Sequence, residues 1–250
     1  MNLELFIARR IAHNGSGNRP GVMVRIAVVA VALSVTVMIL ALAVIMGFKR
    51  EITDRVTGFS AQVEVADLRS AGSIESVPVL RSEQLERTIR SAGEVVRLTP
   101  YAVKGGVVKT PDAILGVMLK GVDGGYEWSF FRDHLLEGEL PRVGDSIRTK
   151  EILISRSVAR EMGLVPGDKV EMLFVESEKS PRRDRFKVSG IYATGMDEFD
   201  RSVAMTDLRN VQRLADWSSE EVSGYEVTLA DFLQAEDFSR RLNDMLLDSD

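Results

Sequence analysis

Few residues of this 250-residue chain could carry out catalysis. Cysteine is absent, and the two histidines are His13 and His134. His134 follows Asp133, but no second histidine stands at the spacing of a helical zinc motif. The Gly-x-Ser-x-Gly sequence that would position a hydrolase nucleophile is also missing. The sequence therefore predicts no catalytic residue and no cofactor.

Three acidic residues, Asp197, Glu198 and Asp200, form a cluster that could hold a hard cation. They lack the alternating ligand positions and the glycine of a calcium-binding loop. A solvent-exposed turn between strands is the better interpretation, so we predict no metal site.

A run of basic residues stands out in an otherwise acidic part of the chain. Pro181, Arg182, Arg183 and Arg185 lie within the segment 179–185, which holds four basic residues and is predicted to form a hairpin tip. Such a tip could dock an acidic partner through charge complementarity. The alternative is a solubilising hairpin end whose charges prevent edge-to-edge aggregation. The residues alone favour this second interpretation.

The charge is unevenly distributed along the chain. Residues 1–50 carry six Lys or Arg and one acid, while the other 200 residues carry 26 basic and 36 acidic side chains, a net charge of −10. A basic N-terminal segment suits anionic headgroups, so membrane lipid is an expected partner. The acidic body argues against nucleic acid as a partner, because binding to nucleic acid requires a basic surface.

The clearest predicted element is an uncharged run from Ile26 to Phe48, which would fix the rest of the chain to a membrane. As an α-helix it is about 34 Å long, enough to cross a hydrocarbon core of roughly 30 Å. We expect a transmembrane helix over 22–48, an amphipathic lead-in over 1–21 and a body over 49–250. Ala41-Leu42-Ala43 has the pattern of a signal cleavage site, but the run continues past it, so an uncleaved anchor is favoured over a secretory signal. The flanking basic residues give only a slight preference for a cytoplasmic N-terminus.

Two pairs of small residues inside this run could let a second helix pack closely. Ala30 and Ser34 are four residues apart, and so are Ala43 and Gly47. Small residues at this spacing allow two helix backbones to approach each other. Alanine is common in membrane helices, so a helix without such a packing face is an equally good interpretation.

The remaining residues alternate between strand and helix patterns, which predicts an α+β body of mixed sheets and helices. Ser82, Ser155 and Thr206 are predicted N-caps, and Gly163 is a predicted helix stop. Because chain ends often share a lobe, we expect two lobes, one of about 60–120 with 222–250 and one of about 125–220. The predicted strands are 62–65, 95–99, 103–108, 114–120, 151–154, 170–175, 186–192 and 225–229, and the predicted helices are 82–93, 155–162, 206–217 and 232–246.

Several short segments, in this order and spacing, resemble those of a known protein family. They are FIARR at 6–10, MGFKREI at 46–52, RVTGF at 55–59, ILIS at 152–155, MGLVPGDKV at 162–170, RFKVSGIY at 185–192, TGMDEFD at 194–200 and VSGYEV at 222–227. Together they resemble lipoprotein-releasing ABC transporter permeases of the LolC/LolE type, in the FtsX/MacB-like permease superfamily. The resemblance covers nearly the whole chain.

The resemblance implies a non-catalytic permease subunit in the bacterial inner membrane, with a cytoplasmic N-terminus and a periplasmic body. A separate cytoplasmic ABC ATPase would hydrolyse ATP. A second permease subunit, either the same chain or a sister chain, would complete the path. Lipoproteins would be drawn from the membrane and passed to a periplasmic lipoprotein carrier.

The resemblance also implies roles for individual residues. Ile45, Met46 and Phe48, at the outer end of the span, would line the lipoprotein path. The segment from Pro181 to Arg185 lies where some members have a loop that hooks the carrier. Members often have a polar residue where this chain has Met46, and their best-developed hooks are longer. They also have three further spans, so we expect the protein to continue beyond Asp250.

Two alternatives remain open for the function. One is a permease with the same architecture in a related ABC system, for efflux or for cell-division signalling. The other is a singly anchored periplasmic binding or sensor module that needs no ATPase. A membrane-anchored hydrolase is the least supported reading, because the nucleophile and base motifs are missing.

Overall fold

The computed structural model describes residues 22–59, 61–70, 76–111, 113–144, 146–176 and 179–247, together with Leu3 and Phe6. Contacts divide the chain into two compact units, Met1–Asp54 and Arg55–Asp250. Leu3 and Phe6 are helical and exposed. The rest of the predicted amphipathic helix lies outside the described residues.

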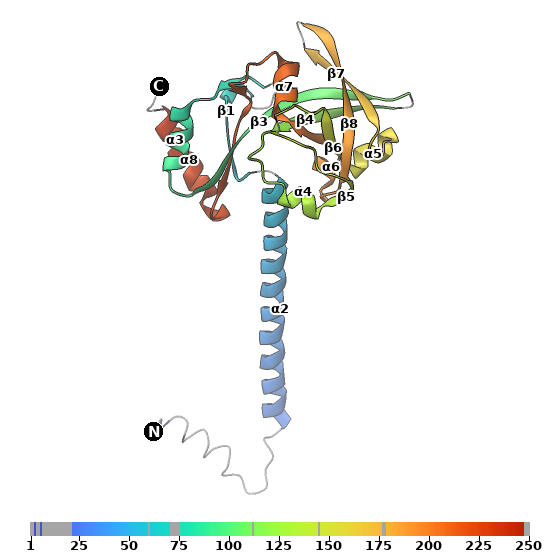
Figure 1. Ribbon diagram of the computed structural model, residues 1–250. Helices are drawn as coiled ribbons and strands as arrows, with labels where there is room; N and C mark the ends of the chain where they lie inside the picture. The colour runs from blue at the N-terminus through green and yellow to red at the C-terminus, as the bar shows by residue number, and fades with distance from the viewer. Residues whose placement is uncertain are drawn as a thin grey trace. The chain divides into compact units, whose positions relative to one another are not determined.

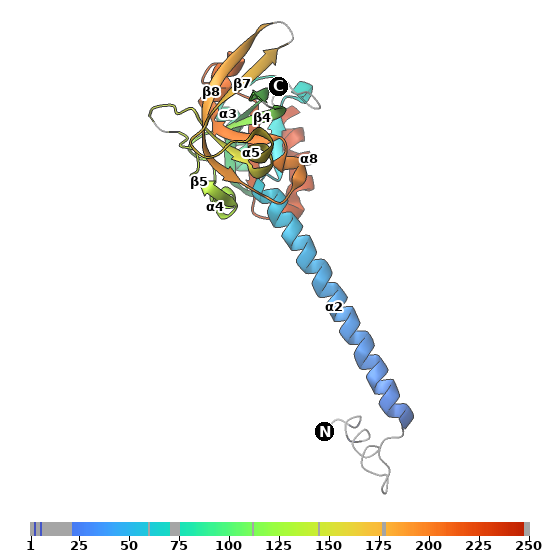
Figure 2. The same ribbon diagram turned by 90° about the vertical axis from the view of Figure 1, so that its right-hand side faces the viewer.

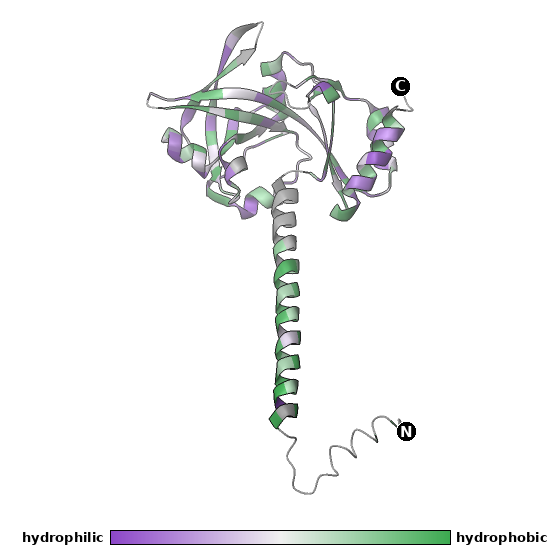
Figure 3. Cartoon of the chain, turned by 180° about the vertical axis from the view of Figure 1, so that it is seen from behind, coloured by the Kyte–Doolittle hydropathy of each residue, from purple (hydrophilic) through white to green (hydrophobic). Residues whose placement is uncertain are grey.

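Helix α2 (Val22–Phe59) contains the predicted apolar helix, which is confirmed. Its segment Val24–Phe48 is 25 residues long and reaches a mean hydropathy of 3.0 over an 18-residue window, and none of that window is buried. Figure 3 shows the ribbon of this segment in the colours of hydrophobic residues along most of its length. α2 continues as helix past Phe48, beyond the predicted end of the span.

The body is α+β, as predicted, with a nine-stranded sheet and a separate two-stranded one. Figures 1 and 2 show its elements from two sides. The strands are β1 (Val63–Ala66), β2 (Val79–Leu80), β3 (Val95–Lys109), β4 (Ile114–Val122), β5 (Leu135–Gly138), β6 (Glu151–Ser155), β7 (Lys169–Glu176), β8 (Lys179–Tyr192), β9 (Val203–Asp207), β10 (Glu221–Val222) and β11 (Gly224–Leu229). The helices are α3 (Glu83–Ser91), α4 (Ser129–Asp133), α5 (Arg156–Met162), α6 (Asp197–Asp200), α7 (Leu208–Ala215) and α8 (Ala235–Leu247), with 3₁₀ turns η1 (Leu68–Ser70) and η2 (Phe232–Gln234).

Six strands of the large sheet pair in a closed ring. β3 pairs with β4, β4 with β9, β9 with β6, β6 with β8, β8 with β7, and β7 returns to β3. The β4–β9 and β6–β8 pairs are parallel, and the other four are antiparallel. In the ring each of these six strands pairs along both of its edges over at least part of its length, which limits the sites for edge-to-edge association.

β3 also belongs to a smaller layer outside the ring. Its first half, from Val95 to Tyr101, pairs with β11, and β11 pairs with β1. Its second half, from Tyr101 to Lys109, pairs with β4. Figure 1 shows α3 and α8 on the side of the body that carries β1. One strand therefore joins the two parts of the body.

The predicted division into two lobes stays a prediction. β3 and β4 lie in the predicted first lobe, yet both take part in the ring with strands of the predicted second lobe. Two further strand predictions, 95–99 and 103–108, are parts of the single strand β3. Pro100 did not interrupt it, although proline inside a strand usually marks an edge.

The hydrophobic core follows from the alternation of side chains along the strands. In β6, Ile152 and Ile154 belong to the main core cluster, while Leu153 belongs to a second cluster on the other face. Successive strand residues point to opposite faces, so a strand buried on both sides has a continuous apolar sequence. In the second cluster, Phe131 packs edge-on against Tyr192, with ring centroids 5.1 Å apart.

The predicted helix caps are mostly confirmed. Ser82 Oγ accepts from the backbone N–H groups of Gln84 and Leu85, and Ser155 Oγ from that of Val158. Gly163 ends α5 in the left-handed conformation, at φ 67°. The predicted cap Thr206 is wrong, because Asp207 caps α7 and the Thr206 hydroxyl instead donates to the Glu151 carbonyl at 2.7 Å.

The acidic cluster at 197–200 is a short helix, α6, and not the predicted turn. The carboxylate of Asp200 accepts from the backbone N–H groups of Thr194 and Gly195 and from the Thr194 hydroxyl, at 2.9–3.2 Å. These bonds close the loop before α6. Across the described residues, no group of three His, Cys, Asp or Glu side chains is arranged to hold a metal ion.

Candidate functional site

The apolar segment of α2 is the first candidate site. Ile45, Met46 and Phe48 are all mostly exposed at its C-terminal end. An α-helix turns about 100° per residue, so Ile45 and Phe48 share one face, while Met46 points at least about 100° away from both. A single path along this helix could therefore contact Ile45 and Phe48 together, with Met46 beside it.

The two pairs of small residues lie on different faces of α2. Ala30 and Ala43 are separated by 13 positions, which corresponds to about 220° of rotation. The Ser34 hydroxyl donates to the Ala30 carbonyl at 2.9 Å, so its polar group is satisfied inside the helix. A Cβ atom added at Gly47 would meet no atom within 4 Å. The pairs could therefore serve two different neighbouring helices, but not one straight neighbour.

The second candidate site is the hairpin of β7 and β8. The predicted long tip is wrong, because both strands extend through it and only residues 177 and 178 lie between them. Arg182, Arg183 and Arg185 pair with Phe174, Leu173 and Glu171 inside the ladder. The arginines therefore line the sides of a rigid hairpin. The sequence suggested a loop here because charged residues dominate one of the two strands.

The hairpin arginines point to alternate sides, as successive strand residues must. Arg183 and Arg185 lie on one face, with side chains 73% and 76% exposed, and their nearest acid is Glu171 at 3.7 and 3.4 Å. Arg182, 38% exposed, turns to the other side and contacts Asp216 and the Arg213 carbonyl at the end of α7. Pro181 is exposed. Only Arg183 and Arg185 therefore present their charge freely enough to meet a partner.

Asp184 holds the base of the hairpin in place. Its side chain is 6% exposed and forms ion pairs with Arg213 of α7 and, at 2.5 Å, with Lys150 in the segment before β6. Desolvation, together with the charges of Arg213 and Arg148, lowers the pKa of Lys150. Asp184 was not among the residues predicted from the sequence. The sequence signal that could have identified it is a single acid among the arginines of this strand, between Arg183 and Arg185.

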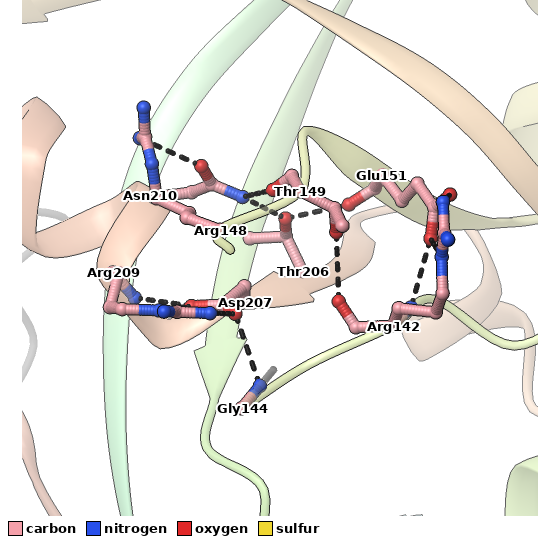
Figure 4. A network of polar contacts seen from close by, with 9 residues as sticks. All are labelled: Arg142, Gly144, Arg148, Thr149, Glu151, Thr206, Asp207, Arg209 and Asn210. Carbon is pink, nitrogen blue, oxygen red and sulfur yellow. Dashed lines mark hydrogen bonds and ion pairs between the residues drawn. The ribbon is translucent and has the colours of Figure 1, made fainter. Parts of the chain in front are cut away.

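A polar network connects the segment before β6 to β9 and α7 (Figure 4). Glu151 accepts a hydrogen bond at 2.7 Å from the Arg142 guanidinium and another from the Arg142 backbone. The Asn210 amide donates to the Thr149 carbonyl and to the Thr206 hydroxyl. The Arg142 side-chain hydrogen bond, although opposed by burial, holds the pKa of Glu151 below its usual value.

Asp207 forms the other end of this network. Burial alone would raise the pKa of Asp207, but hydrogen bonds from Arg209 and from the Gly144 backbone outweigh it and lower the pKa. Gly144 has φ +73°, and a Cβ atom there would lie 2.5 Å from the Gly124 Cα. The close approach of these two loops therefore requires glycine at position 144.

His134, the only described histidine, is part of a helix end. Its Nδ1 atom lies 2.8 Å from the Phe130 carbonyl, and its ring stacks on Phe130 with centroids 4.3 Å apart. Both contacts are local to α4. The described residues thus give His134 a structural setting.

The chain combines a helix that is long and apolar enough to cross a membrane with an α+β body built on a closed ring of strands. A family model, the MacB-like periplasmic core domain, matches residues 26–245 and so covers both parts. The chain belongs to this family.

Curated relatives match over most of the chain. It is 27% identical to the lipoprotein-releasing system transmembrane protein LolC of Xylella fastidiosa (strain 9a5c) over 224 residues, which is 84% of this chain and 50% of the relative. It is 26% identical to the LolC protein of Neisseria meningitidis serogroup B over 201 residues, which is 76% of this chain and 45% of the relative. The chain thus spans about half the length of the curated relatives it matches.

Two solved structures are also similar. The extracellular domain of the noncanonic ABC-type transporter YknZ from Gram-positive bacteria is 15% identical, with a TM-score of 0.45, over 72% of this chain and 90% of that one. The periplasmic region of MacB from Actinobacillus actinomycetemcomitans is 15% identical, with a TM-score of 0.47, over 73% of this chain and 79% of that one.

Proposed function

We propose that this chain forms the first span and periplasmic body of an ABC transporter permease that extracts lipoproteins from the inner membrane. The observation that carries the proposal is the extent of the similarity. One family model runs from inside the apolar helix to inside α8, and proteins named for lipoprotein release match over up to 84% of the chain. The same arrangement of helix and body is expected of such a subunit.

In this proposal, the chain transmits motion and carries out no chemistry itself. A separate cytoplasmic ABC ATPase supplies the energy, and the N-terminus of this chain lies on the same side. A second permease subunit, identical or a sister chain, packs against α2 through Ala30 and Ser34 or through Ala43 and Gly47. Ile45, Met46 and Phe48 contact the lipoprotein at the periplasmic end of the span.

The hairpin would then receive the periplasmic carrier. Arg183 and Arg185 offer two exposed guanidinium groups on one face of a stiff element, and Pro181 stands exposed nearby. Exposed charges of this kind mainly set the rate of association and the choice of partner. Replacing both arginines by glutamate, R183E with R185E, should reduce capture of the carrier by the reconstituted full-length protein.

The matched control is R87E with R90E on α3, which makes the same charge change at exposed positions far along the chain. We expect that control to capture the carrier normally. Equal capture by the hairpin variant and the wild type would remove the docking role and leave the rest of the proposal intact.

The decisive test of the whole proposal is lipoprotein release. Spheroplasts depleted of the full-length protein should retain lipoproteins in the inner membrane, and adding back the gene should restore their release to the carrier. Normal release in the depleted cells would overturn the proposal. A permease for efflux or cell-division signalling would then be the next candidate, since the family description names no cargo.

The gene itself separates the permease from a sensor module. Three apolar segments encoded after residue 250, and an ATPase gene nearby, would support a permease. An open reading frame that stops after this body, with no ATPase that binds the protein, would favour a singly anchored binding or sensor module.

A further inference from the structure

A pocket of about 460 Å³ lies where β7, β8 and β6 meet the segment before β6. Five of its side chains are cationic and one is acidic, although the body as a whole is acidic. The pocket is lined by Arg142, Thr149, Lys150, Glu151, Lys169, Arg185, Phe186 and Lys187. We name it the cationic pocket.

Two lysines of the cationic pocket face each other across the hairpin. Lys169 of β7 and Lys187 of β8 are direct partners in the antiparallel ladder, and Lys187 is also aligned with Glu151 of β6. Like charges directly opposite each other on one face of a sheet destabilise it. Arg185 lies two residues from Lys187, on the same face. The sheet register therefore concentrates positive charge at one place.

The acids around the cationic pocket pair with its other three cationic side chains, Arg142, Lys150 and Arg185. Glu151 is bound by Arg142 at 2.7 Å, and Glu171 lies 3.4 Å from Arg185. Asp184 is shared between Lys150 and Arg213. Among the described residues, none of these carboxylates forms an ion pair with Lys169 or Lys187. Glu151, which is aligned with Lys187, is already bound by Arg142, so it offsets the charge of the lysine pair only in part.

We propose that the cationic pocket binds a small anion carrying phosphate groups. A multivalent anion would relieve the repulsion between Lys169 and Lys187 and accept hydrogen bonds from Arg185 and Arg142. Arginine binds phosphate with a planar fork and lysine binds it as a point charge, and both are present here. The volume suits a small ligand and not a folded partner, since small-molecule pockets measure about 300–1,000 Å³.

This chemistry has two sources, a free phosphate compound or the phosphate of a lipid headgroup. Inorganic pyrophosphate and glycerol 3-phosphate represent them as probes. Each would be titrated into the full chain in neutral nanodiscs, with binding measured by calorimetry and by the shift of the thermal unfolding midpoint. Binding of pyrophosphate alone would indicate a free polyanion, and comparable binding of glycerol 3-phosphate would indicate headgroup chemistry.

The test variant is K169Q with K187Q, which removes the lysine pair and leaves the hairpin arginines in place. We expect its dissociation constant for pyrophosphate to rise by about tenfold or more, because two charge-assisted contacts are lost. The variant should fold, since it removes a repulsion, and its unfolding midpoint without ligand should equal or exceed that of the wild type. The matched control is R87Q with R90Q on α3, which should bind pyrophosphate as the wild type does.

Three results would overturn the proposal. The first is no binding of either probe to the wild type. The second is equal weakening by the lysine variant and the α3 control, which would indicate a general charge effect. The third is tighter binding of a hexa-aspartate peptide than of pyrophosphate through the same lysines, which would make the pocket a site for an acidic protein segment. These results are independent of lipoprotein release, because the readout is binding and stability.

Discussion

Asp184 is the residue on which the position of the hairpin depends most. Its buried carboxylate joins β8 to α7 through Arg213 and to the segment before β6 through Lys150. Removing one partner of a buried ion pair costs more than the pair contributes, because the remaining charges lose their compensation. Here the two cations stay about half exposed, which limits that cost.

The substitution D184N should therefore lower the free energy of unfolding by about 1–3 kcal/mol. Urea unfolding, followed by the fluorescence of Trp128 and Trp217, measures it, because both tryptophans lie in the body. The control is E161Q, an exposed acid of α5, which should change stability by less than about 0.5 kcal/mol. A D184N protein as stable as E161Q would contradict the assigned role of Asp184.

Glu151 gives the body a predictable response to acid. Its pKa in the folded state is lowered from 4.5, first by the Arg142 hydrogen bond. An acid with a lowered folded-state pKa stabilises the fold above its unfolded-state pKa, and this contribution is lost as the pH falls through the folded-state value. Stability should therefore begin to decrease below about pH 4.5.

The variant E151Q tests this origin of the acid response. It should be less stable than the wild type at pH 7 and should lose less stability between about pH 5 and pH 3. The difference between the two unfolding free energies, measured across that range, should shrink toward low pH. Parallel curves would show that Glu151 does not contribute to the response.

At the scale of elements, the contact between β3 and β7 sets the shape of the ring. Gly106 of β3 lies under the ring of Phe174, and a Cβ atom there would come within 2.6 Å of the phenylalanine Cε1 atom. Phe174 is fully buried, so it has little room to move. G106A should cost about 1–3 kcal/mol through overpacking.

Gly116 of β4 supplies the matched control, because an added Cβ atom would meet nothing within 4 Å. G116A should be neutral or slightly stabilising, since alanine restricts the unfolded chain. Thermal unfolding of both variants gives the comparison. Equal thermal unfolding midpoints for G106A and G116A would mean that the contact of Phe174 with β3 does not require glycine at position 106.

The elements predicted correctly are those with a local chemical signal. Ser82, Ser155 and Gly163 mark helix ends through their own backbone bonds, so the sequence around them suffices. β9 was missed, because its five residues pair with strands far away in the chain, β4 and β6. The first half of β8, up to Arg185, was predicted as a hairpin tip and not as strand, because its charged side chains find Glu171, Asp216 and Arg213 only after folding.

The candidate site shows the same limit. The apolar helix and the arginines could be identified from residue types alone. The cationic pocket could not be identified in this way. It depends on the pairing of Lys169 with Lys187 across the hairpin and on the ion pair of Arg142 with Glu151 of β6. Both depend on contacts that close only in the folded ring.

At the scale of the whole molecule, the apolar segment of α2 determines where the protein resides. Twenty-five residues with no buried side chain would expose a large apolar surface in water. A charge at the centre of a membrane helix costs about 2.5–3.5 kcal/mol. V37K, near the middle of Val24–Phe48, should therefore reduce stable membrane integration.

The control is V24K, which places the same charge next to Arg25 at the end of the segment, where a lysine can reach the interface. Extraction of membranes at alkaline pH separates integrated from released protein. We expect more release of V37K than of V24K and the wild type. Equal retention of all three would argue against a membrane span.

Strand β3 gives the body a continuous mechanical connection. It is one covalent backbone of 15 residues, about 50 Å when extended, that begins beside β11 and ends beside β7. A load applied at the hairpin passes through the β7–β3 hydrogen bonds and then along peptide bonds that do not stretch. In the proposed permease, this one strand would carry a push from the β7 end of the body to the β11 end.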